Sequence, residues 1–527
     1  MKKTHSLTVT TIFSALLFFF FFISQFPPVL SFTRSQCKGW LVQSIPTDMP
    51  QLQLVQGVLS TRDVFVWLAG NSTRRLDIIA QYWELLAGPN DSRSGDYGYS
   101  NEDLKKFGAN KGYDVYSAIE KAADRNVNVR LVSHSGVYPT FGKEPADLAS
   151  GRPNVQNVTL LLGDWYGSGI VHSKVWISDD RDVYIGSANQ DWKSLSQVKE
   201  LGIYLTGCPK IAAHVKVYFD NLLKLAFLNP TDYTRTIFDH QWQTQRKVPC
   251  WSYFIDPESR CRQVQPFSSP LPPYVKFLHT LGYPIISDPY TLNLSIQTPG
   301  SRLSTLLPHS CYLSFAPPEL LFGRYQSDEQ AWSDTIKSVS NGATVRISTM
   351  DWLGQSEFTN PTIYWSSLSS AISEVVFSKN ATVRLLVSYW THFVEGTDPY
   401  LKSLLYSNIL CNSSKFNDCF GKVEIKYYVV PGYNETGPAL YHNRTRTENR
   451  YPSFTRVQHG KYAVSDVRAH IGTSNLGWDY FYVTSGVSFG TYNPAIVKQL
   501  QEVFDADWNS PYTLPVKAIQ DGPTFSS

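Results

Sequence analysis

The chain has 527 residues, which is more than one ordinary hydrophobic core accommodates and therefore predicts two domains. Charged residues make up 17% and aromatic residues 14% of the chain, which excludes an intrinsically disordered protein and indicates a globular one with a large core. The formal net charge of +3 is too small to indicate, by itself, binding to nucleic acid or to acidic lipid.

Residues 1–31 predict a targeting segment. Lys2 and Lys3 precede an apolar run from Ile12 to Ile23, which is shorter than the roughly 20 residues that a membrane span needs. This order favours a cleaved secretory signal peptide. The alternative is an uncleaved anchor that extends to Phe32 and leaves the bulk of the chain in the lumen. No later stretch of the sequence is apolar enough to predict a second span.

The predicted elements of the two halves follow the same order. Apolar runs in the first half predict a strand, a helix and two more strands over residues 74–83, 114–126, 127–133 and 157–163. The second half repeats this order over residues 343–352, 363–377, 381–390 and 423–430. Strands that alternate with helices predict an α/β fold. The proline-rich residues 246–300 predict a connection between the halves.

After these elements each half contains the same motif, H-x-K-x4-D followed by G-[ST]-x-N. Side chains alternate between the faces of a strand, so the histidine and lysine of each copy should point the same way. Together the two copies offer two imidazoles, two ammonium groups and two carboxamides, which suit an anionic phosphoryl group and need no metal or other cofactor. The candidate residues are His172, Lys174, Asp179 and Asn189 in the first copy, and His459, Lys461, Asp466 and Asn475 in the second.

Two further patterns agree with a secretory route. Seven cysteines include no C-x2-C pair, so they favour disulfides in an oxidising compartment over a zinc site, and the close pairs Cys250/Cys261 and Cys411/Cys419 would each close a short loop. Eight sequons predict N-glycosylation at Asn71, Asn90, Asn157, Asn293, Asn380, Asn412, Asn434 and Asn443.

The motif pair resembles the HKD motifs of the phospholipase D superfamily. The segments SANQDWKSLSQVKELG (187–202), HIGTSN (470–475) and DWNSPY (507–512) are similar to its lumenal branch, which includes lysosomal 5′-exonucleases acting on single-stranded nucleic acid. The resemblance implies two pseudo-symmetric α/β domains, each a β-sheet flanked by helices, with the active site at their seam. We place these domains at residues 37–245 and 301–515.

The resemblance also implies a two-step mechanism. One histidine attacks phosphorus and forms a phosphohistidine, and the other protonates the leaving oxygen and then activates water. Glu200 stands where the superfamily places an acid that orients the motif histidine, whereas the equivalent position after Asn475 is Gly486. A histidine bonded to a carboxylate is more basic. We therefore predict His172 as the nucleophile and His459 as the general acid.

Other roles follow from the same resemblance. It suggests a disulfide between Cys37 and Cys208, which leaves Cys311 without a partner. Asp179 and Asp466 complete the motifs and belong to the candidate catalytic set, although a structural role as turn carboxylates is favoured for both. Core packing is likewise favoured over base stacking for the tryptophans that follow the motif asparagines, Trp192 and Trp478.

The predicted function is a lumenal phosphodiesterase, preferably a 5′-exonuclease on single-stranded DNA or RNA. The alternative is a phospholipase D or phosphatidyl transferase acting on glycerophospholipids, and a catalytically silent binding protein is disfavoured because both motifs are intact. A nuclease needs a cationic channel with aromatic faces, and a lipase needs an apolar rim. The secretory route predicts the endoplasmic reticulum to the lysosome or vacuole, or secretion. The sequence leaves the oligomeric state open.

Overall fold

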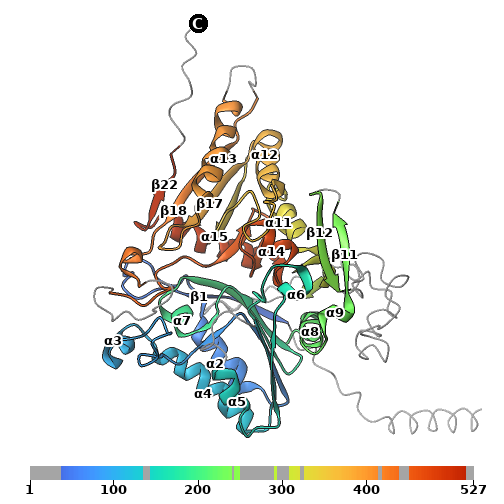
Figure 1. Ribbon diagram of the computed structural model, residues 1–527. Coiled ribbons are helices and arrows are strands. Elements are labelled where there is room, and N and C mark those ends of the chain that lie inside the picture. Colours follow the sequence, from blue (N-terminus) through green and yellow to red (C-terminus); the bar gives the residue numbers. More distant parts are fainter. Residues whose placement is uncertain are drawn as a thin grey trace, which may run out of the picture. The chain divides into compact units, whose positions relative to one another are not determined.

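Two large mixed β-sheets, one from each half of the sequence, form the framework of the protein in this computed structural model (Figure 1). The structure describes residues 37–134, 143–239, 242–249, 290–293, 308–320, 326–412, 418–437 and 450–517, all of which belong to one compact unit. The predicted targeting segment, Cys250, Cys261, Asn443 and most of the predicted connection 246–300 lie outside the described residues.

The first sheet has the strand order β2-β1-β10-β8-β7-β3-β5-β6. Its strands are β1 (Lys38–Ser44), β2 (Leu59–Ser60), β3 (Arg75–Ala80), β5 (Asn128–His134), β6 (Val155–Leu160), β7 (Val175–Ser178), β8 (Asp182–Gly186) and β10 (Glu200–Thr206). Strands β3, β5 and β6 run parallel, and the pairs from β3 through β7, β8 and β10 to β1 are antiparallel.

Both faces of this sheet are covered, which is why its strands are almost continuously apolar. Ile78 of β3 packs with helices α2 (Thr61–Asn71) and α4 (Asn110–Asp124), whereas its neighbour Ile79 belongs to the core shared with α8 (Pro209–Leu225). The alternation of side chains along a strand therefore separates the two cores. Smaller elements of this half are β4 (Trp83–Glu84), α3 (Asn101–Lys106), α5 (Lys143–Ala149), α6 (Gly163–Tyr166), β9 (Gln190–Asp191), α7 (Trp192–Ser196), α9 (Pro230–Tyr233), β11 (Thr234–Asp239) and β12 (Thr244–Pro249).

The second sheet has the order β13-β14-β21-β20-β19-β16-β17-β18-β22, with β15 beside β14. Its strands are β13 (Tyr290–Asn293), β14 (Pro308–Ala316), β15 (Gln326–Ser327), β16 (Thr344–Thr349), β17 (Thr382–Ser388), β18 (Lys422–Tyr428), β19 (Lys461–Val464), β20 (Ala469–Gly472), β21 (Gly486–Thr491) and β22 (Thr513–Pro515). Its helices are η3 (Pro318–Leu320), α11 (Asp328–Lys337), α12 (Ser367–Lys379), α13 (Thr397–Cys411), η4 (Tyr433–Glu435), α14 (Trp478–Tyr482) and α15 (Pro494–Trp508).

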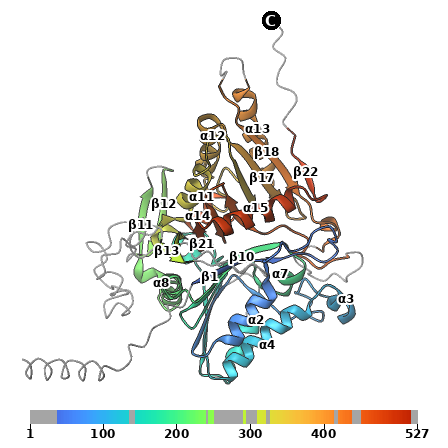
Figure 2. The ribbon, with the colours of Figure 1, turned by 180° about the vertical axis from the view of Figure 1, so that it is seen from behind.

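The two sheets repeat one topology. The order β1-β10-β8-β7-β3-β5-β6 in the first corresponds strand by strand to β14-β21-β20-β19-β16-β17-β18 in the second. The sheets meet where β8 contacts β20 and β21, and Figure 2 shows α15 between them, against β1 of the first sheet. The predicted α/β class with two related sheets is confirmed. The domain boundaries at 37–245 and 301–515 stay predictions.

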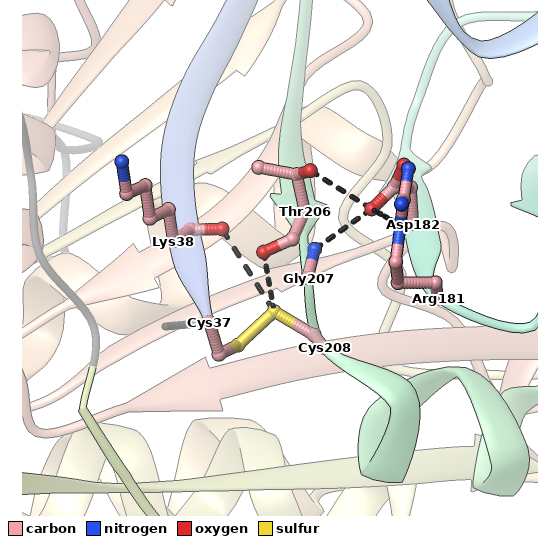
Figure 3. Close-up of a disulfide and its surroundings, with 7 residues drawn as sticks. All are labelled: Cys37, Lys38, Arg181, Asp182, Thr206, Gly207 and Cys208. Atoms are coloured by element: carbon pink, nitrogen blue, oxygen red, sulfur yellow. Dashed lines mark hydrogen bonds and ion pairs between the residues drawn. A yellow bond between two sulfur atoms is a disulfide. The ribbon is translucent and has the colours of Figure 1, made fainter. Parts of the chain in front are cut away.

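Two disulfides are present in the described residues. Cys37 precedes β1 and bonds to Cys208, which caps α8, so the bond closes the end of the antiparallel β1–β10 pair (Figure 3). Beside it, the Asp182 carboxylate accepts hydrogen bonds from the Thr206 hydroxyl and the Gly207 backbone N–H at 2.8 and 2.7 Å (Figure 3). The second disulfide joins Cys411 to Cys419.

Two of the three predicted pairings are thus confirmed, the pair Cys250/Cys261 stays a prediction because it lies outside the described residues, and Cys311 is a buried free thiol. Disulfides of this kind indicate a compartment of the secretory route. No helix in the described parts of the chain combines the length and hydropathy needed to cross a bilayer. Of the predicted glycosylation sites, Asn71, Asn90, Asn412 and Asn434 are exposed, while Asn157 and Asn380 are half-buried. Glycosylation stays a prediction.

The two disulfides should contribute unequally to stability. Cys37–Cys208 spans 171 residues and Cys411–Cys419 spans 8, so the longer loop loses more entropy in the unfolded chain when it is closed. Cys37→Ser should therefore lower the free energy of unfolding by roughly 5 kcal/mol and Cys411→Ser by roughly 2.5 kcal/mol. Scanning calorimetry of both variants measures the difference, with the paired variants Cys37→Ser/Cys208→Ser and Cys411→Ser/Cys419→Ser as controls for the thiol left behind. Equal losses would contradict the loop-length argument.

Candidate functional site

The two motifs face one cavity of about 300 Å³ at the seam between the sheets. Its lining includes His172 and Asn189 from the first motif and His459 and Asn475 from the second. Lys174 and Lys461 are fully buried, and the charges of both affect His172, so they lie close to the same cavity. The structure therefore brings together six of the eight motif residues named in the sequence.

Each motif histidine is fixed by a backbone hydrogen bond to a residue of the other half. The backbone N–H of His172 donates to the Ser485 hydroxyl at 2.9 Å, and the backbone N–H of His459 donates to the Lys199 carbonyl at 2.8 Å. The strands that follow the histidines begin only at Val175 and Lys461, so both histidines lie in the segments that enter these strands. The prediction that each His and Lys share one strand is wrong to that extent, because cross-seam contacts replace the ladder there.

The motif glycines allow the chains to pack closely beside the cavity. A Cβ atom at Gly186 would lie 2.5 Å from the Cα of Gly202 on the neighbouring strand. At Gly472 it would lie 2.3 Å from the Ser488 hydroxyl oxygen. Since real Cβ atoms do not approach so closely, Gly186 must be glycine, whereas a side chain at Gly472 would require the Ser488 hydroxyl to move. The motif asparagines follow these glycines by three residues and line the cavity.

Glu200 contacts the histidine of the other motif. Its carboxylate oxygens lie 2.9 and 3.0 Å from Nδ1 of His459, and its Oε2 also accepts a hydrogen bond from Ser187. The sequence prediction that Glu200 orients His172 is wrong. Glu200 begins β10 directly after Lys199, whose carbonyl binds the His459 backbone, and this contact turns the carboxylate across the seam. Glu200 supplies the orienting group of His459 that the sequence analysis did not identify.

His172 has a different environment. In the described structure it has no ion-paired or hydrogen-bonded carboxylate, and its ring packs edge-on against the Tyr480 ring at a centroid distance of 5.1 Å. Tyr480 also lines the cavity. Ser485 and Tyr480 were not predicted as site residues from the sequence. Tyr480 follows Asn475 by the same interval at which Ser194, another lining residue, follows Asn189, and this interval is a signal that the repeat offered.

The cavity carries buried positive charge. Burial holds the pKa of Lys174 well below its usual value, and Lys461 lowers it further. Burial also lowers the pKa of Lys461 to about 7, although Glu200 and Asp351 oppose this shift. Because an anion inside the cavity would raise the pKa of both ammonium groups and pay for their desolvation, the site is suited to a negatively charged group.

The same surroundings lower the pKa of both motif histidines. Burial lowers the pKa of His172 well below its usual value, and Lys174, Lys461 and His459 lower it further. Burial lowers the pKa of His459 to about 4, but Glu200 opposes this shift because its carboxylate stabilises the imidazolium. His172 is therefore held neutral, whereas His459 has a partner for its protonated form.

Asp179 and Asp466 lie outside the cavity. Asp179 accepts hydrogen bonds from the backbone N–H groups of Arg74 and Arg75 at 2.8 and 2.9 Å, and exposed Asp466 accepts one from the Ser340 backbone at 2.9 Å. Each carboxylate fastens a neighbouring loop, which agrees with the structural role favoured for both from the sequence rather than with a place in the catalytic set. Trp192 and Trp478 are buried in the core, as predicted from the sequence.

The rest of the cavity is aromatic and acidic. Its aromatic lining consists of Tyr82, Trp390, Phe454 and Tyr480, and its acidic lining includes Glu84 and Asp191. The Phe454 backbone has a positive φ of 57°, and its ring stacks on His392 with the centroids 5.0 Å apart. No cluster of three or more potential metal ligands occurs in the part of the chain that the structure covers.

The known proteins that this chain resembles agree with the family that the two motifs indicate. Residues 52–245 match the family model described as PLD3/4, PLD-like domain. The chain is 27% identical over 506 residues to phospholipase D Y of Dictyostelium discoideum, covering 94% of this chain and 97% of that protein. It is 29% identical over 500 residues to the 5′-3′ exonuclease PLD3 of Xenopus laevis, covering 92% and 82%.

Neither half of the cavity should work alone. His172→Ala and His459→Ala should each lower the turnover of bis(4-nitrophenyl) phosphate at least about 10³-fold, because the first removes the nucleophile and the second removes the base that activates water in the second step. Steady-state kinetics of the purified variants measures this loss.

The matched control comes from the second motif itself. Asp466→Ala should keep turnover within a few-fold of the wild type, because this carboxylate is exposed and outside the cavity. Substantial activity in either histidine variant would show that the two motifs do not share one reaction site.

Proposed function

Because the chain belongs to the phospholipase D superfamily, we propose that it is a lumenal phosphodiester hydrolase that degrades single-stranded nucleic acid from its 5′ end. One observation carries this proposal: the histidines and asparagines of both motifs line a single cavity that also has aromatic walls. The buried lysines supply charge for a phosphodiester, and the aromatic rings supply faces for bases.

The first step uses His172 as the nucleophile. Attack requires a neutral imidazole, and burial among Lys174 and Lys461 keeps His172 neutral. An imidazole nitrogen of His172 bonds to phosphorus while the bond from phosphorus to the leaving oxygen breaks. This supports the role predicted for His172, although the reason differs, since Glu200 does not contact this residue.

His459 supplies the proton in this step. Glu200 binds its Nδ1, so the other ring nitrogen is free to protonate the leaving oxygen. In the second step His459 accepts a proton from water, whose oxygen attacks phosphorus and breaks the bond to His172. A phosphodiester bound beside both histidines adds negative charge and raises the pKa of His459, so the acid is protonated when it is needed.

The walls of the cavity favour nucleic acid over lipid. Four aromatic side chains line it, and stacking on such rings contributes about 1–3 kcal/mol per base. The aliphatic lining is limited to Val198, Val457 and the thioether-bearing Met350 among the described residues, which is little surface for acyl chains. Glycerophospholipid is the second candidate, because relatives such as the one from Dictyostelium carry the name phospholipase D.

The secretory route sets where this reaction takes place. We propose a lysosome or vacuole as the final compartment, with residues 1–31 as the signal peptide or anchor that directs the chain into the lumen. The disulfides and the exposed sequons Asn71, Asn90, Asn412 and Asn434 support this route.

A direct comparison of substrates tests the function. The purified protein should shorten a 3′-labelled single-stranded DNA stepwise from its 5′ end and release little choline from phosphatidylcholine vesicles. Both assays contain EDTA, which should leave activity intact because the proposed steps use only side chains of the chain. His172→Ala is the negative control. Choline release without DNA shortening would favour the lipid candidate, and zinc-reversible loss in EDTA would contradict the mechanism.

Glu200→Gln should affect proton donation more than attack. Glu200 raises the pKa of His459, so its removal lowers that pKa and depletes the protonated acid at a lower pH. The alkaline limb of the pH–rate profile should therefore move to lower pH. Turnover with an alkoxide leaving group should fall by about 10² to 10⁴-fold. Turnover with a 4-nitrophenolate leaving group should fall less, because this leaving group needs little protonation.

Rates with the two leaving groups distinguish the proposed roles, His172 as nucleophile and His459 as general acid, from the opposite assignment. Equal slowing of both, with no movement of the alkaline limb, would show that Glu200 serves the attack step and that the roles of the histidines are exchanged.

A further inference from the structure

Two residues occupy equivalent places beside the motif asparagines. Beyond the central strands β3 and β16, the chain continues to Tyr82 in the first half and to Asp351 in the second, each followed by a buried tryptophan. These tryptophans, Trp83 and Trp352, form bridges with the residues that directly follow Asn189 and Asn475. The repeat thus places Tyr82 and Asp351 at the same position relative to the two asparagines.

Both residues accept a hydrogen bond from an asparagine side chain. Nδ2 of Asn475 donates to Oδ2 of Asp351 at 2.7 Å in a buried contact. Nδ2 of Asn189 donates to the Tyr82 hydroxyl at 3.3 Å, and that hydroxyl donates in turn to Oδ2 of Asp191 at 3.0 Å. Since Asp191 takes its only proton, the Tyr82 hydroxyl can only accept from Asn189.

These contacts determine which end of each amide faces the phosphoryl group. A carboxylate has no proton to donate, so Asp351 binds the nitrogen of the Asn475 amide and repels its oxygen. Tyr82, with Asp191 behind it, selects the nitrogen of Asn189 in the same way. Each Nδ2 carries two N–H groups, so one holds the anchor while the second can donate to an anion.

We propose that Tyr82 and Asp351 are positioning residues that fix the Asn189 and Asn475 amides with an N–H group toward the phosphoryl oxygens. The inference rests on the proposed phosphodiesterase function and adds the groups that orient its oxyanion donors. Donors fixed before the reaction stabilise the transition state without reorganisation, so these contacts act mainly on kcat.

The two anchors differ in charge, and this difference separates positioning from charge compensation. Asp351 opposes the burial-driven fall in the pKa of Lys461, whereas Tyr82 carries no charge. Asp351→Asn removes the charge but keeps an oxygen that can accept from Asn475. Asp351→Ala removes both. Tyr82→Phe removes the acceptor of the other asparagine and leaves the ring.

Kinetics on bis(4-nitrophenyl) phosphate and inhibition by inorganic vanadate, which mimics the five-coordinate phosphorus, test the proposal. Tyr82→Phe and Asp351→Ala should each lower kcat about 10 to 100-fold, less than complete loss of an oxyanion donor, and weaken vanadate inhibition by a similar factor. KM should stay within about threefold. Asp351→Asn should retain kcat within about fivefold of the wild type.

Matched controls are Tyr364→Phe and Asp164→Asn, since Tyr364 is 69% exposed and Asp164 is also exposed. Both should behave as the wild type, and thermal midpoints of all variants show that they are folded. Wild-type kcat in Tyr82→Phe and Asp351→Ala, or an Asp351→Asn variant as impaired as Asp351→Ala, would overturn the positioning role. A wild-type protein that cleaves no phosphodiester would instead contradict the proposed function.

Discussion

The contact between Glu200 and His459 across the seam is the interaction on which the site depends. It joins a carboxylate at the start of β10 to a histidine that enters β19, and the backbone bond from His459 to Lys199 fixes the same junction. The Ser485–His172 bond makes the reciprocal connection. Each half therefore orients the histidine of the other. Neither sheet alone can present a competent pair, which explains why the motif must occur twice.

Charge burial is the cost of this arrangement and the source of its chemistry. Lys174 and Lys461 are removed from water, and this burial lowers the pKa of both. A phosphodiester supplies the missing charge, so binding and protonation are coupled. The amides of Asn189 and Asn475 stabilise the same anion without adding a charge that must be buried. Aromatic walls then determine which phosphodiester fits.

Local patterns made much of this structure predictable. Apolar runs located central strands such as β3 and β16, and the repeated motif identified His172 and His459 although they lie far apart in sequence. The partner of Glu200 was predicted wrongly, because spacing along one chain does not reveal which side of a seam a carboxylate faces. Asp351 was missed because its contact with Asn475 forms only in the folded sheet, and Tyr480 was missed although the repeated interval after the motif asparagines was a signal for it.

The central claim is that His172 carries the covalent intermediate while His459 handles protons. His459→Ala should still attack an ester with a 4-nitrophenolate leaving group, but it lacks the base that activates water, so the intermediate should accumulate. Rapid mixing should release about one equivalent of nitrophenolate per enzyme. After an alkaline denaturing quench, peptide mapping by mass spectrometry should find the phosphoryl group on His172. A phosphoryl group on His459 in the wild-type enzyme, with none on His172 in the His459→Ala variant, would contradict the account.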